Sequence, residues 1–138
     1  MISFFEEEIE FKLKEKLKLK KWINSVCEIY KRKAGDINYI FCNDEYLLEI
    51  NKQYLKHDFY TDIITIDQSE PGKKIDAEIY ISVDRVKENA ETNKVSFSQE
   101  LNRIIIHGVL HLIGFKDKSE AEALEMRNLE NRMLEMIA

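Results

Sequence analysis

The amino-acid sequence predicts an α+β protein in which a small mixed sheet of about four strands packs with about five helices. Two patterns support this fold class: short apolar segments with the period of a strand, and longer segments whose apolar residues recur at helical spacing. The chain has 138 residues, enough for one domain with a sizeable core and too few for two ordinary domains. Because one proline and four glycines leave little room for linkers, we expect a single domain over residues 1–138.

The first two expected elements are a short strand and a helix. Residues 2–5 form the strand. The helix is predicted by an apolar stripe at helical spacing, which consists of Leu19, Ile23, Val26, Cys27 and Tyr30. Residues 11–19 alternate with period 2, so the pattern does not define where this helix begins.

Gly35 and Asp36 are expected to break the chain before a strand over residues 37–43. Asn43 or Asp44 can then cap a second helix, because short polar side chains accept hydrogen bonds from the free N–H groups of a first turn. This helix runs through Leu47, Leu48, Ile50, Asn51 and Tyr54.

Residues 62–67 and 77–83 are expected to be neighbouring antiparallel strands, because the turn sequence EPGKK lies between them. Ser82 or Asp84 can cap a third helix over residues 86–93. This part of the chain therefore adds two strands and one helix to the expected domain.

Two longer helices complete the domain. Ser96 or Ser98 can cap the first, which contains the apolar segment IIIHGVLHLI. Ser119 followed by Glu122 is a capping-box pattern for the second. The apolar stripe of this last helix consists of Ala123, Met126, Leu129, Met133, Leu134 and Ile137.

The apolar helix carries two histidines, His107 and His111, four residues apart. Residues at i and i+4 lie on the same helical face, so both imidazoles can point toward one metal ion. Gly114 stands where a helix ends in a left-handed residue, which would turn the chain back and bring Asp117 to the same point. The pattern predicts a metal site at the end of a buried helix, with two nitrogen ligands, one oxygen ligand and a position open for water.

This spacing matches the long zinc signature of metallopeptidases, except that Gly108 replaces the general-base glutamate. A peptidase is therefore disfavoured, whereas a metal-dependent hydrolase is favoured. A histidine on an apolar helix is more often a core residue bonded to the backbone. We favour the metal because two buried rings and a glycine that costs about 1 kcal/mol of helix stability would otherwise bring no structural return.

Residues 107–118, HGVLHLIGFKDK, resemble the signature H-G-x-L-H-L-x-G-[YF]-x-x-[HD] of the YbeY family of bacterial single-strand-specific endoribonucleases and ribosomal RNA maturation factors. Residues 48–67 and 77–90 are similar to two further segments of that family, so the resemblance spans roughly residues 38–125. It implies a cytoplasmic, metal-dependent endoribonuclease that cuts single-stranded RNA, matures the 3′ end of 16S ribosomal RNA and acts in ribosome quality control. Ribosomal proteins or an assembly GTPase are its expected further partners.

The resemblance implies one zinc ion held by His107, His111 and Asp117. Asp117 stands where the family usually has a third histidine, and aspartate is an accepted zinc ligand. A carboxylate is also a harder ligand than imidazole, so manganese could take the place of zinc.

Two other departures from the family lie in the segment over residues 48–67. Leu55 replaces an arginine and Tyr60 replaces a proline, and the first change leaves the contact to the scissile phosphate unassigned. Thr61 and Asp62 match a Thr-Asp pair of the family. They either orient the loop or serve as turn and capping residues.

Three further residues are candidates for catalysis or phosphate binding. His57 lies in the expected substrate-facing loop, where it could also be a simple exposed histidine. Lys56 and Arg103 are candidates to replace the missing arginine, although lysine offers a point charge in place of a bidentate fork. Arg103 could instead form a surface ion pair with Glu100.

The net charge of −5 is unusual for a nucleic-acid-binding protein, but six lysines cluster in the segment KLKEKLKLKK over residues 12–21. They form either a solvated helix face or an RNA backbone contact. No apolar run approaches the roughly 18 residues of a membrane span, and the N-terminus lacks a signal-peptide pattern, so we expect no membrane association. Cys27 and Cys42 are isolated in the sequence and are expected to be buried thiols.

Two other functions stay open on the sequence alone. A metal hydrolase with a small-molecule or peptide substrate would have a tight, closed pocket in place of a groove. A ribosome-assembly binding protein with a structural zinc would have a fourth protein ligand, because structural zinc sites are closed and catalytic sites keep a free position.

Overall fold

The computed structural model describes all 138 residues and contains one sheet, five α-helices and a π-helical turn. In chain order the elements are β1 (Ile2–Glu6), α1 (Lys16–Ile29), β2 (Ala34–Cys42), α2 (Asp44–Ile50), η1 (Asn51–Leu55), β3 (Ile63–Asp67), β4 (Ile75–Ser82), α3 (Val83–Asn93), α4 (Phe97–Ile113) and α5 (Glu120–Glu135).

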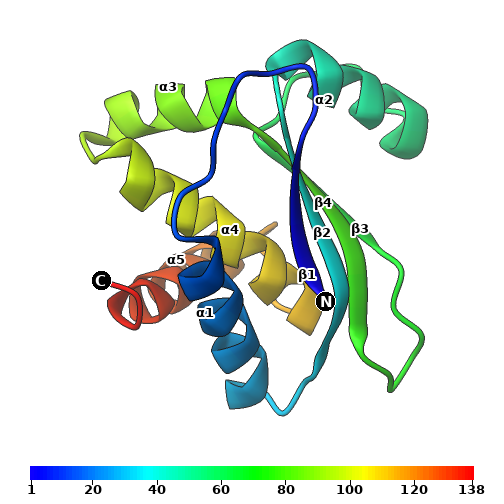
Figure 1. Cartoon of the computed structure of the whole chain (residues 1–138), viewed down its shortest axis with the longest axis vertical. Coiled ribbons are helices and arrows are strands. Elements are labelled where there is room, and N and C mark those ends of the chain that lie inside the picture. The colour runs from blue at the N-terminus through cyan, green and yellow to red at the C-terminus, as the bar shows by residue number, and fades with distance from the viewer.

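The sheet is mixed and has the strand order β1-β2-β4-β3 (Figure 1). Strands β1, β2 and β4 are parallel, whereas β3 runs antiparallel to β4. The predicted antiparallel pair is therefore confirmed, and so is the α+β class with four strands and five α-helices. No helix of the chain has the length and apolar character that crossing a bilayer requires.

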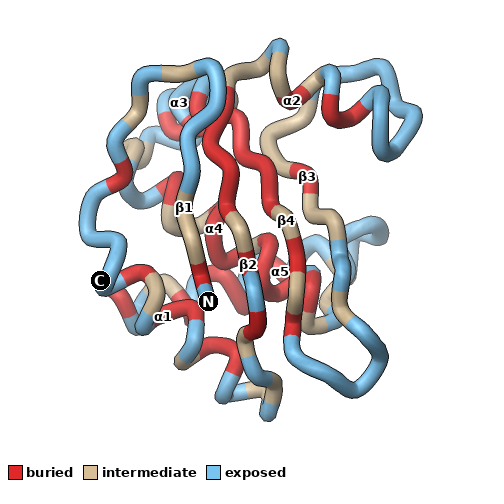
Figure 2. The backbone as a smooth tube through the Cα atoms, turned by 45° about the vertical axis from the view of Figure 1, so that its right-hand side comes forward, coloured by how far each residue is buried: buried red, intermediate tan, exposed pale blue.

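Strands β2 and β4 are largely buried (Figure 2). Alternate residues of β2 contribute to two hydrophobic cores on opposite faces of the sheet. Tyr39 and Phe41 point into the larger core, which the sheet shares with α1, α4 and α5. Ile40 and Cys42 point into the smaller core, beneath α2. The hydroxyl of Tyr39 donates to the carbonyl oxygen of Ile105 at 2.9 Å, which links β2 directly to α4.

The expected break at Gly35 and Asp36 is wrong, because both residues belong to β2 at a point of irregular register. Contacts from distant parts of the chain stabilise this irregularity. The N-terminal amine of Met1 donates to the Gly35 carbonyl oxygen at 2.8 Å, and the Asp36 N–H donates to Asp76 Oδ1 at 2.7 Å. A side chain at position 35 would collide with Asp76, so the glycine is required for this close approach.

The helix caps agree with the sequence pattern. The side chains of Asn43, Ser82, Ser96 and Ser119 each accept a hydrogen bond from an N–H of the following first turn. Ser119 and Glu122 form the expected reciprocal capping box. The second helix is shorter than predicted, because its α-helical part ends at Ile50 and the chain continues as the π-helical turn η1.

Cys27 and Cys42 are free and fully buried, as predicted. Burial raises the pKa of Cys27 to about 11 and that of Cys42 to about 12. Both side chains are therefore neutral thiols at physiological pH and act as small core residues.

Candidate active site

Helix α4 packs against the sheet through Gly108. A Cβ atom at this position would lie 3.2 Å from Cδ1 of Ile63 and 3.2 Å from Cδ1 of Ile79. The expectation that this glycine brings no structural return is therefore wrong, because its missing side chain lets α4 approach β3 and β4 closely. The same contacts show that position 108 faces strands β3 and β4.

We expect the substitution Gly108→Glu to lower the free energy of unfolding by more than about 3 kcal/mol, because it would overpack the α4–sheet contact and bury an unpaired carboxylate. Gly108→Ala is the control, since a methyl group requires the neighbouring isoleucines to shift only slightly. Urea unfolding of both variants measures the effect. A stable Gly108→Glu protein would mean that position 108 faces the cavity.

The turn after α4 brings Asp117 back toward the helix. Gly114 ends α4 with a φ of 130°, and its N–H donates to the carbonyl oxygens of Leu110 and His111. Asp117 then lies beside His107, with Oδ2 at 3.4 Å from Nε2. A glycine that ends the helix thus places a carboxylate next to the first of the two histidines.

His107 is held from its other side by the last helix. Its Nδ1 atom lies 2.7 Å from Oε2 of Glu130, a buried residue of α5. Arg103, one turn earlier on α4, donates from Nη1 to Oε1 of the same carboxylate at 3.0 Å and from Nη2 to Oδ1 of Asn131 at 2.7 Å. Arg103 therefore pairs with α5 and not with Glu100, the neighbour considered from the sequence.

The pKa of His107 reflects these contacts. Burial alone would lower it, but the hydrogen bond with Glu130, reinforced by the nearby carboxylates of Asp117 and Asp62, raises it above the ordinary value. The surrounding carboxylates thus favour a cation at this position, whether a proton or a metal.

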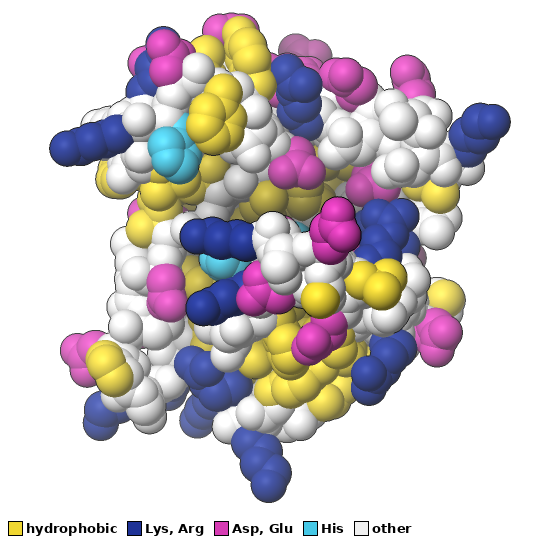
Figure 3. All heavy atoms as spheres, turned by 180° about the vertical axis from the view of Figure 1, so that it is seen from behind, with side chains coloured by type: hydrophobic (Ala, Val, Ile, Leu, Met, Phe, Trp, Pro, Cys, Tyr) yellow, Lys and Arg dark blue, Asp and Glu magenta, His cyan; other side chains and the backbone are white.

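Two open cavities of about 350 and 240 Å³ adjoin His107. Both are lined by Asp62, Ile63, His107 and Asp117. His111 borders the smaller cavity. Seen from this face, imidazole groups lie recessed at the centre, among basic and acidic side chains (Figure 3).

Asp62 and Arg127 are two lining residues to which the sequence assigned no catalytic role. Burial raises the pKa of the Asp62 carboxyl above its ordinary value, although a hydrogen bond donated by Asn89 to Oδ2 at 3.3 Å opposes this shift. Arg127, from the exposed side of α5, lines the cavity of about 350 Å³ and forms no ion pair. It is a free cation at the edge of a carboxylate-rich site.

The chemistry of the donor set suits a divalent metal, although the side chains do not converge fully. No group of three His, Cys, Asp or Glu side chains comes close enough together to hold a metal ion. Of the three predicted ligands, His107 and Asp117 contact each other, whereas His111 is exposed and contacts neither. The 3.4 Å between His107 Nε2 and Asp117 Oδ2, however, matches the separation of about 3.3 Å between two ligands of tetrahedral zinc. The carboxylate on Nδ1 is the usual outer partner of a metal-bound histidine.

The predicted residues Lys56 and His57 do not line either cavity. They lie in the exposed loop after η1, where Lys56 adopts a left-handed backbone with a φ of 56° and the His57 ring stacks on Phe59. The chain leads from this loop to Thr61 and Asp62, which do border the cavities. Of the predicted catalytic residues, only Arg103 lies at the candidate site.

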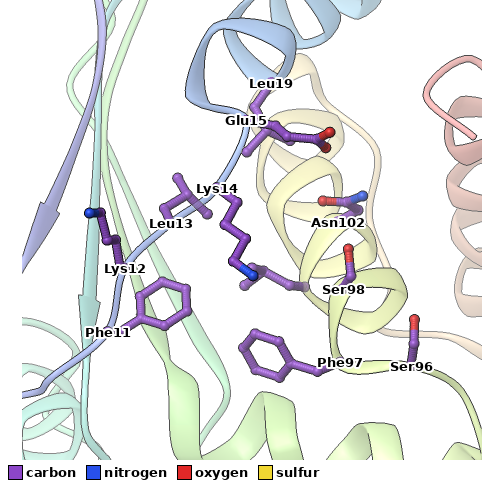
Figure 4. A pocket seen from close by; sticks show the side chains of 11 residues that line it. Phe11, Lys12, Leu13, Lys14, Glu15, Leu19, Ser96, Phe97, Ser98 and Asn102 are labelled. Atoms are coloured by element: carbon purple, nitrogen blue, oxygen red, sulfur yellow. The ribbon is translucent and has the colours of Figure 1, made fainter.

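A larger cavity of about 510 Å³ lies between the segment that precedes α1 and the start of α4 (Figure 4). The rings of Phe11 and Phe97 line it, and Lys12 and Lys14 belong to its wall. It contains no histidine and none of the predicted site residues. Two members of the lysine-rich segment thus lie at this apolar cavity, away from His107.

Comparisons with known proteins identify the family of the chain. A family model described as Endoribonuclease YbeY matches residues 2–138, well beyond the segments that carry the sequence resemblance. Proteins named Endoribonuclease YbeY from Flavobacterium psychrophilum and Parabacteroides distasonis are 51% and 48% identical to this chain over 136 residues, which cover 99% of it and 96% and 95% of those proteins. The solution structure of TM1509 from Thermotoga maritima is also similar, with a TM-score of 0.64 and 29% identity over 99% of this chain and 89% of that one. The chain therefore belongs to the endoribonuclease YbeY family.

Proposed function

We propose that this protein is a metal-dependent endoribonuclease that cuts single-stranded RNA, with maturation of the 3′ end of 16S ribosomal RNA and ribosome quality control as its role. One observation carries the proposal: His107 is held between Glu130 and Asp117 at an open cavity that also contains His111. Family membership supports RNA as the substrate.

In this proposal His107, His111 and Asp117 hold one zinc ion, or another divalent metal such as manganese. The exposed imidazole of His111 has to turn toward the other two ligands. Since a carboxylate only accepts hydrogen bonds, Glu130 keeps the proton of His107 on Nδ1 and leaves Nε2 free as a ligand. The chemistry that a divalent metal supplies in such a site is Lewis acidity toward water and toward a phosphoryl oxygen.

The remaining residues of the cavity supply proton transfer and phosphate binding. Position 108 carries no base, so Asp62, whose carboxyl lines both cavities, is the candidate acceptor for the proton of the attacking water. Arg127 is the candidate for the phosphate contact, because it is unpaired, whereas Arg103 is engaged by Glu130 and Asn131. Arg127 would thus take over the role of the family arginine, whose position is occupied by Leu55 in this chain.

Cleavage of matched single- and double-stranded RNAs, with and without a chelator, tests the proposal. We expect metal-dependent cutting of the single strand and poor cutting of the duplex, since a flexible strand brings a phosphate in line with the attacking water more readily than an A-form helix does. Metal-loaded protein that cuts neither RNA would favour the binding-protein alternative. Metal-independent cutting would indicate a contaminating ribonuclease.

The Arg127→Ala variant is expected to raise KM for RNA about 10-fold and to reduce the dependence of binding on salt concentration, because one phosphate contact is lost. Arg132→Ala, on the same helix but outside the cavities, is the matched control. Equal KM values and salt dependences for the two variants would assign the phosphate contact to another residue.

The substitution Asp117→His is expected to preserve or raise zinc affinity, because imidazole is an equally good zinc ligand and the family normally has it at this position. Competition with a chromogenic chelator measures the affinity, and Asp117→Ala provides the comparison. If Asp117→Ala binds zinc as tightly as the unchanged protein does, Asp117 is not a ligand.

A further inference from the structure

The loop between η1 and β3 exposes an unusual amount of apolar surface. Ten large hydrophobic residues are exposed in the whole chain, and four of them fall in the seven residues from Tyr54 to Tyr60. They are Tyr54, Leu55, Phe59 and Tyr60, with exposed fractions of 44–56%. Exposed apolar residues are ordinary when scattered, whereas a contiguous cluster usually marks a binding surface.

A buried asparagine fixes the backbone of this loop. Asn51 is 1% exposed, and its side chain donates from Nδ2 to the carbonyl oxygen of Phe59 at 2.8 Å. Its own carbonyl oxygen accepts the N–H of His57 at 3.2 Å. Lys56 begins the loop in a left-handed backbone conformation, which reverses the chain after η1. Two hydrogen bonds to the buried Asn51 therefore fix the backbone that carries the exposed rings.

The rings of the loop are ordered with respect to one another. His57 and Phe59 stack with centroids 5.0 Å apart and an interplanar angle of 20°. The Tyr60 hydroxyl donates to Glu45 Oε1 at 2.7 Å, and the Arg85 guanidinium lies 5.1 Å from the centre of the Tyr60 ring. Imidazole and hydrophobic groups project together at the upper left of Figure 3, over α2 and η1.

This surface adjoins the candidate active site through the chain itself. Only two residues, Tyr60 and Thr61, separate Phe59 from Asp62, so at most about 10 Å of extended backbone lies between the exposed ring and the cavity. Lys56 forms no ion pair, which leaves its ammonium group free for a phosphate. An RNA strand whose phosphate lies at His107 would therefore pass a stacked aromatic pair and an available cation.

We propose that His57 and Phe59 form a stacking platform for one unpaired nucleobase of the RNA substrate, with Lys56 contacting the adjoining phosphate. This inference rests on the proposed function. Stacking on an aromatic ring accepts any base, because every base has a π-face, and it requires a base that is not already stacked in a duplex. The platform thus adds a preference for single strands that is independent of the metal site.

Binding of a labelled single-stranded oligoribonucleotide, measured by fluorescence anisotropy in the presence of a chelator, tests the platform without cleavage. Phe59→Ala is expected to weaken binding about 5- to 150-fold, the effect of losing one base–aromatic stack. Phe59→Trp should retain affinity, whereas Phe59→Leu should not. Phe5→Ala is the matched control, because Phe5 is a similarly exposed phenylalanine on β1. An abasic oligonucleotide of equal length should bind the unchanged protein and Phe59→Ala equally.

The outcomes separate the platform from the nuclease proposal. If the unchanged protein cuts RNA and Phe59→Ala binds it equally well, the platform is wrong and the nuclease proposal stands. If Phe59→Leu binds the RNA as tightly as the unchanged protein does, the contact is apolar and the stacking platform is wrong. If the unchanged protein neither binds nor cuts RNA, both proposals fail together.

Discussion

Replacing His107 by alanine is expected to remove most of the bound metal and to lower kcat/KM for RNA cleavage by more than about 100-fold. Loss of an outer partner of a metal ligand typically costs about 10- to 100-fold in affinity or activity, so loss of the ligand itself should exceed that range. The position of His107 supports this expectation, since its two ring nitrogens face Glu130 and Asp117.

Metal analysis of the purified protein, together with cleavage assays, measures both effects. Asn102→Ala serves as the control, because Asn102 belongs to the same helix but lines the larger, histidine-free cavity. His111→Ala should behave like His107→Ala if both imidazoles bind the metal. Unchanged metal content in both histidine variants would remove the basis of the metal site.

Removing the carboxylate of Glu130 is expected to have the largest effect on stability. Glu130→Ala should lower the free energy of unfolding by about 3–5 kcal/mol, because it leaves the half-buried guanidinium of Arg103 without its carboxylate partner. It should also weaken metal binding about 10- to 100-fold, because the His107 ring would lose the carboxylate that orients it through Nδ1.

Chemical denaturation with and without added zinc measures the two effects separately. Glu130→Gln should lose less stability than Glu130→Ala, since an amide oxygen can still accept one of the two hydrogen bonds. Glu125→Ala, at an exposed position of the same helix, should change stability by no more than about 0.5 kcal/mol. If Glu130→Ala is as stable as Glu125→Ala, the buried network contributes no net stabilisation.

The features that the sequence predicted correctly are those fixed by neighbouring residues. The caps at Asn43, Ser96 and Ser119 depend on N–H groups three residues away, and the apolar stripes depend on helical periodicity. The irregularity at Gly35 depends instead on Met1 and Asp76, which are distant in the chain, so the local pattern was misleading.

The candidate site shows the same division between local and distant information. The spacing of His107, Gly114 and Asp117 predicted a turn that brings histidine and carboxylate together, and the structure contains that contact. Glu130 was missed, although it stands between apolar residues on the stripe of the last helix, and a charge on an apolar face is a detectable signal. Its partners lie on another helix, which one sequence cannot identify.

Docking of the last helix determines when the site is complete. All three proposed metal ligands precede residue 118, yet Glu130 belongs to α5, which is also anchored by a hydrogen bond from Trp22 Nε1 to the Met133 carbonyl oxygen at 2.9 Å. A growing chain that has not yet released α5 from the ribosome carries every ligand but lacks the group that orients His107. The order of synthesis therefore delays assembly of the candidate nuclease centre until α5 has also been made and has left the ribosome.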